Sequence, residues 1–178
     1  MTSDEALMAA VRDGSREAFA TLFDRYRQAI WGFFRRRVAD RGRAEELTQD
    51  AFVAVLEGAG RYEARGPVRS YLFGIAYNIL LADRRRVASA PAPLLHDVAG
   101  APADRDAALW IQSALAQLDA GDRELIMLRE YDELSYLEIA HLQSIPINTV
   151  RSRLFRARMA LKQGLEARAR VGVGHAAG

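Results

Sequence analysis

The segment from residue 148 to residue 158 carries side chains that can bind nucleic-acid bases and phosphates. Polar, aromatic and basic residues are interleaved along it: Asn148, Thr149, Arg151, Ser152, Arg153, Phe155, Arg156 and Arg158. A period of 100° per residue places four apolar side chains on one helix face: Val150, Leu154, Ala157 and Leu161. The opposite face is then free to enter a groove, where an arginine can bond to N7 and O6 of guanine. Arg153 and Arg158, nearer the flanks, are expected to hold phosphates.

A shorter helix must precede this basic helix and hold it in place. Ser135 and Glu138 have the spacing of a capping box, which predicts a helix start at Ser135. The helical pattern breaks at residues 143–145, and Pro146 then supplies the fixed φ that suits the first turn of a new helix. Two short helices joined by a tight turn, the second of them basic, predict a DNA-binding helix-turn-helix.

Charge is distributed in a way that agrees with this prediction. The whole chain has a net charge of only +2, but residues 147–170 carry +6 and residues 119–138 carry −5. A basic helix face alone is often no more than a solvated surface. Here the basic residues coincide with the capping box and the turn, so we interpret them as a phosphate-facing surface.

Composition excludes several classes of function. The 178 residues include no cysteine and three scattered histidines, which excludes disulfides and thiol chemistry and argues against a metal site. No long apolar run is present, and the acidic N-terminus does not resemble a signal peptide. No nucleophile or paired-carboxylate motif stands out. We expect a soluble, cytoplasmic protein that is not an enzyme and has no cofactor, no membrane contact and no small-molecule substrate.

Helical periods dominate the whole chain and predict an all-α protein. Ser3 and Ser15 are expected to cap the first two helices, and further helices are expected over residues 44–57 and 68–86. Three prolines then mark residues 88–105 as a flexible linker. The prediction is two small helical domains, residues 1–87 and 106–170, the second with the helix-turn-helix, followed by a flexible tail over residues 171–178.

The chain resembles bacterial sigma factors of the extracytoplasmic function group, within the sigma-70 family, in both halves. The C-terminal similarity covers LDAGDRELIMLREYDELSYLEIAHLQSIPINTVRSRLFRARMAL, and the N-terminal similarity covers AEELTQDAFVAVLE and VRSYLFGIAYNILLADRRR. The resemblance implies a protein that binds the RNA polymerase core and promoter DNA, and that is controlled by an anti-sigma factor. It assigns the duplex minus-thirty-five element to the eight residues listed above.

The resemblance also assigns two sites to the N-terminal half. The minus-ten element, as an opened strand, would be bound by Arg65, Arg69, Ser70, Tyr71, Tyr77, Asn78, Arg84 and Arg85. The helical period places Tyr77 and Asn78 outward, and the alternative is that Tyr71 and Tyr77 are ordinary half-buried aromatics. Polymerase would be bound by one side of the helix over residues 44–57: Glu46, Gln49, Asp50, Val53 and Glu57. Without the neighbouring motifs, such an acidic face would more simply be solvated.

Two residues depart from the family pattern in the turn of the helix-turn-helix. Ser144 stands where glycine is usual and Gln143 where an apolar residue is usual. The turn is therefore expected either to be looser or to be closed by a bond from Gln143 to the backbone. The alternative function is a stand-alone helix-turn-helix regulator that binds duplex DNA as a dimer, for which a dimer interface would be needed. A helical adaptor would leave the basic helix without a purpose.

Overall fold

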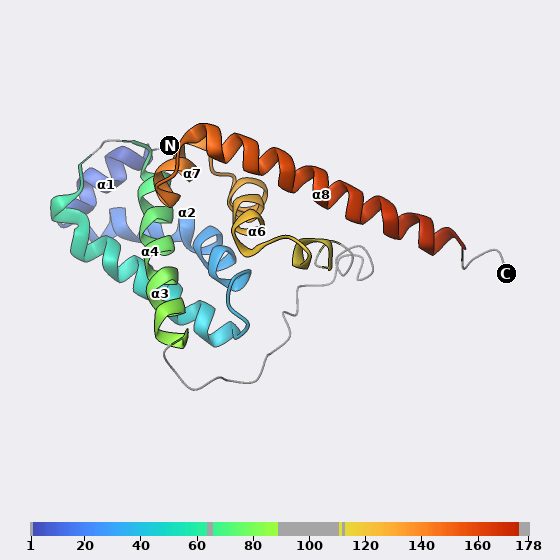
Figure 1. The fold of residues 1–178 in the computed structure, drawn as a ribbon. Coiled ribbons are helices and arrows are strands. Elements are labelled where there is room, and N and C mark those ends of the chain that lie inside the picture. Colours follow the sequence, from blue (N-terminus) through green and yellow to red (C-terminus); the bar gives the residue numbers. More distant parts are fainter. Residues whose placement is uncertain (1, 64–65, 89–110, 112, 175–178) are drawn as a thin grey trace. The chain divides into compact units, whose positions relative to one another are not determined.

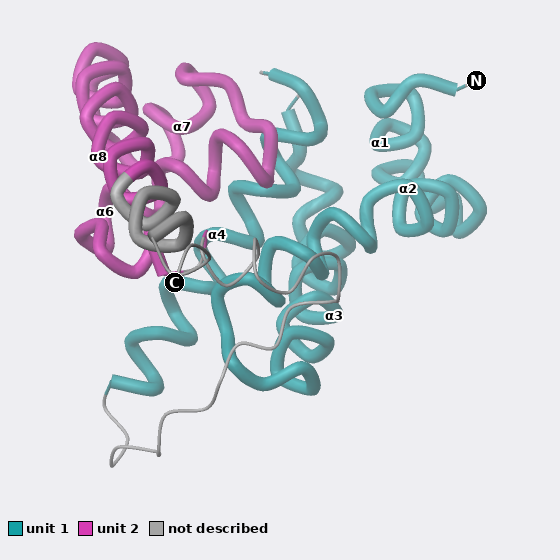
Figure 2. Tube along the Cα trace, turned by 90° about the vertical axis from the view of Figure 1, so that its right-hand side faces the viewer, with its two compact units in different colours: residues 1–98 teal, residues 99–178 magenta. Residues whose placement is uncertain are grey.

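The computed structural model describes residues 2–63, 66–88, 111 and 113–174, with side chains described to residue 166. Within these ranges all regular structure is helical, which confirms the predicted fold class (Figure 1). The chain divides into two compact units, residues 1–98 and 99–178, coloured separately in Figure 2. The predicted linker falls on residues 88–105, of which only Ala88, the last residue of a helix, lies within the described ranges.

The described residues of unit 1 form four α-helices and a short 3₁₀ turn. These elements are α1 (Asp4–Arg12), α2 (Arg16–Arg35), α3 (Arg41–Gly58), η1 (Ala59–Arg61) and α4 (Val68–Ala88). Ser3 and Ser15 cap α1 and α2 as predicted, since their hydroxyls accept hydrogen bonds from the amides of Ala6 and Ala18. Helix α3 begins earlier than predicted, because Asp40 accepts from the amide of Arg43 at 2.7 Å and caps it.

Aromatic side chains fill the core of unit 1 where α4 packs against α1, α2 and α3. Phe33 and Phe34 of α2 are fully buried, and Phe73 of α4 lies edge-on to Phe33 with ring centroids 5.8 Å apart. Burial of each such ring contributes about 2–3 kcal/mol. The position of α4, which carries the predicted strand-binding residues, is therefore fixed by the core.

Unit 2 holds the helix-turn-helix. Its named elements are α6 (Ala120–Ile126), a π-helical turn η2 (Met127–Tyr131), α7 (Tyr136–Gln143) and α8 (Ile147–Gly174). Helix α8 continues through Gly174, into the segment expected as a tail. In the described part of the chain, no helix is both long and apolar enough to cross a membrane.

The junction between α7 and α8 shows how the sequence closes the turn. Ser135 and Glu138 form the predicted capping box, with bonds of 3.2 Å and 2.6 Å between each side chain and the other residue's amide. Ser144 adopts a left-handed conformation with φ of 54°, and the amide of Ile145 bonds to the carbonyl of Ala140 at 3.0 Å. This is the usual left-handed helix end with serine in place of glycine. The turn is thus closed by its own backbone, at a conformational cost of about 1 kcal/mol.

Candidate nucleic-acid interface

The start of α8 presents a polar face to solvent, as its residue spacing predicts. Val150, Leu154 and Ala157 are buried in unit 2. Five candidate residues on the other side of the helix are exposed: Asn148, Arg151, Ser152, Phe155 and Arg156. Thr149, also on that side, is half-buried. Phe155 is 66% exposed, the largest exposure among the large apolar side chains that the structure describes. We name these six residues, 148, 149, 151, 152, 155 and 156, the outer face of α8.

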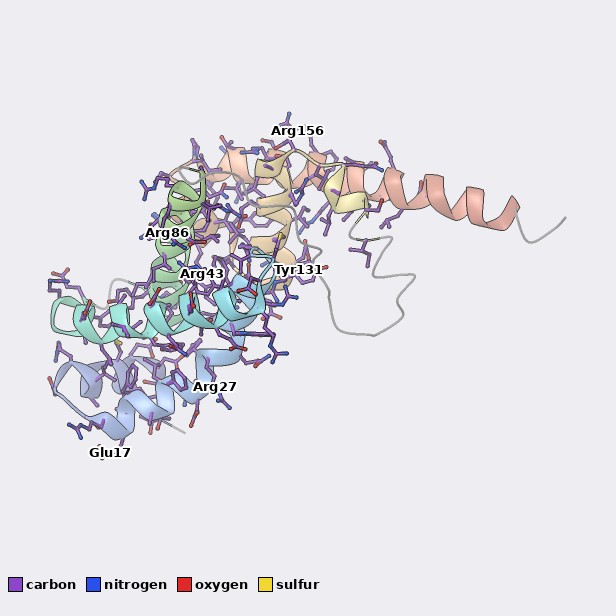
Figure 3. All side chains as sticks on the ribbon, turned by 90° about the horizontal axis from the view of Figure 1, so that it is seen from below. Glu17, Arg27, Arg43, Arg86, Tyr131 and Arg156 are labelled. Carbon is purple, nitrogen blue, oxygen red and sulfur yellow. The ribbon has the colours of Figure 1, made fainter. Side chains whose placement is uncertain are left out.

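Some side chains on the outer face already form hydrogen bonds to described residues of the unit, and Arg156 does not. Arg151 donates to the Asn148 side-chain oxygen at 3.2 Å, and the Ser152 hydroxyl donates to the Thr149 carbonyl at 3.1 Å. Arg156 makes no hydrogen bond or ion pair to any described residue, and Figure 3 shows it projecting from the outer edge of the unit. Its guanidinium is therefore available to an anion or a base edge.

Arg153 and Arg158 flank the buried stripe of α8 on opposite sides and bind acidic residues of the same unit. Arg153 donates from Nε to Asp122 at 2.7 Å, and its Nη2 lies 3.6 Å from Asp119. Arg158 bonds to Glu130 at 2.5 Å and to the hydroxyl of Tyr136 at 3.0 Å. Hydrogen bonds to Glu130 and Tyr136 raise the pKa of Arg158 above its ordinary value. These two arginines are separate from the outer face.

Helix α4 of unit 1 exposes some of its candidate residues and buries another. Asn78 and Arg85 are exposed, and the side-chain amide of Asn78 bonds to no described residue. Arg84 is also exposed. Tyr77 is only 8% exposed, so its expected outward orientation is wrong. The buried side of α4 includes both Phe73 and Tyr77, because the helix packs against α1, α2 and α3.

The remaining candidate residues of this surface lie at the start of α4. Arg69 and Ser70 are half-buried, and the Arg69 guanidinium lies 4.7 Å from the centre of the Phe73 ring. Tyr71 is also half-buried, with its ring 4.9 Å from that of Tyr62 in the preceding loop. Burial raises the pKa of both tyrosines, so both stay neutral at physiological pH. Arg65 lies outside the described residues.

A buried carboxylate on α4 was not found by sequence reasoning. The side chain of Asp83 is only 6% exposed, and it accepts hydrogen bonds from Arg43 at 3.1 and 2.7 Å and from Arg86 at 3.0 Å. Burial works to raise the pKa of Asp83, but the bonds from Arg86 and Arg43 outweigh it and the pKa lies below its ordinary value. Figure 3 labels the two arginines. This network ties the start of α3 to the end of α4.

All five candidate polymerase-binding residues are exposed on one side of α3: Glu46, Gln49, Asp50, Val53 and Glu57. Val53 is 51% exposed, and Leu56 beside it is exposed as well, although the sequence analysis did not select it. Glu46 is paired with Arg43 at 2.6 Å. The result is an acidic helix surface with an apolar centre. Among the described residues, no cluster of acidic or histidine side chains could hold a metal ion.

Comparison with known proteins finds matches along most of the chain. Residues 22–89 match the family described as Sigma-70 region 2, and residues 108–161 match Sigma-70, region 4. The RNA polymerase sigma-H factor of Pseudomonas aeruginosa is 30% identical, with 92% of this chain and 94% of that protein covered. The ECF RNA polymerase sigma factor SigW of Bacillus subtilis is 29% identical, with 87% and 92% covered.

Two solved structures have a similar fold. One is CnrH in complex with the cytosolic domain of CnrY, with a TM-score of 0.69, 26% identity, and coverage of 93% of this chain and 99% of that one. The other is the sigma factor RpoE of Bartonella quintana in complex with the anti-sigma factor NepR. It has a TM-score of 0.70, 25% identity, and coverage of 83% and 96%.

Proposed function

Because the chain belongs to the sigma-70 family, in the extracytoplasmic function group of RNA polymerase sigma factors, we propose that its two units read two separate promoter elements. Unit 2 binds the minus-thirty-five element as duplex DNA. Unit 1 binds the RNA polymerase core and the minus-ten element as an opened strand. One observation carries the proposal. The same chain exposes the outer face of α8 and, on α4, an asparagine and arginines.

The outer face of α8 suits the major groove of a duplex. Arg156 is long, charged and without a partner among the described residues, so it can bond to a guanine or a phosphate. Phe155 offers an apolar surface to a thymine methyl group, and Asn148 and Ser152 can bond to base edges. The first turns of α8 carry these groups, as in other helix-turn-helix proteins, where the N-terminal residues of the second helix contact bases.

The surface of α4 suits bases that have left the duplex. Asn78 can bond to an unpaired base edge, while Arg84 and Arg85 can hold the backbone. The half-buried pair Tyr62 and Tyr71 flanks the loop that would receive a flipped base. Tyr77 supports this surface from beneath, because it is buried. A strand-binding surface of this kind would have no use in a protein that reads only duplex DNA.

Helix α3 supplies the surface for the polymerase core. Val53 and Leu56 form an apolar centre with Asp50 and Glu57 beside them, a pattern that fits a partner with a hydrophobic contact ringed by basic side chains. CnrH and the Bartonella RpoE are each held by a protein partner in their structures. We extend this to the present chain: an anti-sigma factor covers it, and it acts in the cytoplasm without catalysing a reaction itself.

An initiation assay tests the proposal. The purified chain is added to sigma-free bacterial core polymerase on genomic DNA fragments, and transcript starts are mapped by sequencing, with core polymerase alone as the control. We expect discrete starts preceded by a shared two-part motif. If the chain binds specific duplexes by itself but neither binds core nor supports initiation, the stand-alone regulator becomes the better description.

A further inference from the structure

Resting on the proposed function, we infer that Arg153 and Arg158 are positioning residues that set the rotation of α8 about its own axis, and that neither contacts DNA. The two side chains leave the helix on opposite sides of the buried stripe formed by Val150, Leu154 and Ala157. Arg153 reaches the start of α6, whereas Arg158 reaches η2 and α7. We call the contacts of Arg153 the first strut and those of Arg158 the second strut. Together the two struts orient the outer face.

The first strut joins α8 to the start of α6. Asp119 caps α6, because its carboxylate accepts from the Asp122 amide at 2.9 Å, and Asp122 lies in the first helical turn. Arg153 bonds to Asp122 at 2.7 Å and approaches Asp119 at 3.6 Å. Its side chain is 26% exposed and that of Asp122 is 16% exposed, so water screens the pair only in part. One guanidinium thus bridges two carboxylates at a single helix end.

The guanidinium of Arg153 passes directly over Gly121 of α6. A Cβ atom added at Gly121 would collide with Nη2 of Arg153. Gly121 has an ordinary helical backbone, so alanine there would favour the helix itself. Alanine at position 121 would therefore displace the guanidinium of Arg153 without removing any charge.

The second strut joins α8 to η2 and α7. Arg158 bonds to Glu130 through Nε at 3.0 Å and Nη2 at 2.5 Å, and through Nη1 to the hydroxyl of Tyr136 at 3.0 Å. Arg129 lies over the Tyr136 ring at 5.5 Å and bonds to the carbonyl of Leu134 at 3.0 Å, which steadies the tyrosine. The second strut is more exposed than the first, since the Arg158 side chain is 43% exposed. We therefore expect it to contribute less.

Rotation of α8 about its axis matters because it moves every side chain of the outer face. With side-chain tips about 5–6 Å from the helix axis, a roll of about 10° moves each tip by about 1 Å. That is enough to misplace a bidentate bond from Arg156 to a guanine while leaving charge near the phosphates. Loss of a strut should therefore reduce the preference for the specific site and spare non-specific binding.

Binding of the full chain to two duplex probes tests this inference. One probe is a random-sequence duplex of about 20 base pairs, long enough for two helical turns. The other carries the upstream motif from the mapped start sites or, if no initiation occurs, a motif selected from genomic fragments by the chain itself. Arg153→Lys is the decisive variant, because lysine keeps the charge that a phosphate contact needs but lacks the planar guanidinium whose Nε and Nη2 reach Asp122 and Asp119 separately. Arg156→Gln is the matched control from the outer face.

For Arg153→Lys and Arg153→Gln we expect a three- to tenfold loss of preference for the specific probe, roughly the scale of coupled neighbouring residues. The slope of binding against salt on the random duplex should stay unchanged for both. Gly121→Ala should lose preference in the same way while its melting temperature is kept. The reversed pair, Arg153→Glu with Asp122→Arg, should recover part of the preference, which a lost phosphate contact cannot do.

The opposite pattern would overturn the inference. If Arg153→Lys binds like the original protein and Arg153→Gln lowers the salt slope by about 0.9, Arg153 is a phosphate contact. If all variants lose both specific and random binding together with their helical circular dichroism, the arginines serve only stability and do not orient the face. Failure of the proposed function is seen separately, as absence of initiation by the unsubstituted chain.

Discussion

Replacement of Asp83 by asparagine should destabilise unit 1 by about 2 kcal/mol at neutral pH. Removal of one partner from a buried ion pair costs about 3–5 kcal/mol when the remaining charge stays buried. Here Arg43 and Arg86 are 27% and 65% exposed, so water can solvate both once the carboxylate is gone, and the amide oxygen can still accept one bond. The expected loss of unfolding free energy is therefore below the roughly 3–5 kcal/mol of a fully buried pair.

Fluorescence of Trp31 can report this loss from unit 1 alone. The chain has two tryptophans, so a Trp110→Phe background leaves only Trp31, which lies in α2. With a typical urea dependence for a small domain, a loss of about 2 kcal/mol lowers the unfolding midpoint by about 1 M. Asp50→Asn is the matched control, because Asp50 is exposed on α3 and should change the midpoint little.

The pH dependence supplies the refuting test. The pKa of Asp83 is lowered in the folded protein, so its stabilising contribution is complete above the ordinary aspartate value of about 3.9 and is lost as pH falls through the folded value. The difference in the free energy of unfolding between the original chain and Asp83→Asn should therefore be constant from about pH 8 to 5 and should shrink below about pH 4. No difference at pH 7, or one that persists unchanged in acid, would refute the reasoning.

Four further substitutions test separate surfaces. Arg156→Ala should weaken binding to the specific duplex about tenfold or more, and unchanged affinity for that duplex would remove this residue from the contacts. Asn78→Ala should impair open-complex formation, measured by permanganate reactivity, while core binding stays normal. Val53→Glu should weaken core binding about tenfold or more in a direct binding assay, with Asn78→Ala as its control. Ser144→Gly should relieve the left-handed strain and stabilise unit 2 by about 1 kcal/mol in thermal unfolding, and a loss of stability would contradict the strain.

Local signals predicted the helix-turn-helix well. The capping box of Ser135 and Glu138 needs only residues three apart, and both of its bonds are present. The buried stripe of α8 follows from the helical period, since it is narrow and the rest of the helix is polar. Both features depend only on residues close together in the sequence, so the sequence alone is enough to predict them.

Which side of α4 faces the core could not be predicted in the same way. This helix is apolar on most sides from Leu72 to Leu81, so its period alone leaves several faces equally suited to the core. Contacts with α1, α2 and α3 decide between them, and they bury Tyr77 and Phe73. The burial of Asp83 depends on Arg43, 40 residues away, which no local pattern reveals.

Four arginines in the first half of α8 show most directly what cannot be seen in a sequence alone. Arg151, Arg153, Arg156 and Arg158 have the same chemistry and similar spacing, and each could hold a phosphate. Their roles divide according to partners on other elements: Arg153 meets a carboxylate 31 residues earlier, and Arg158 meets one 28 residues earlier. The acidic segment before the helix-turn-helix therefore does more than oppose the basic helix in net charge. It binds the two arginines beside the buried stripe, and so leaves the charge of Arg151 and Arg156 on the side of the helix that can reach DNA.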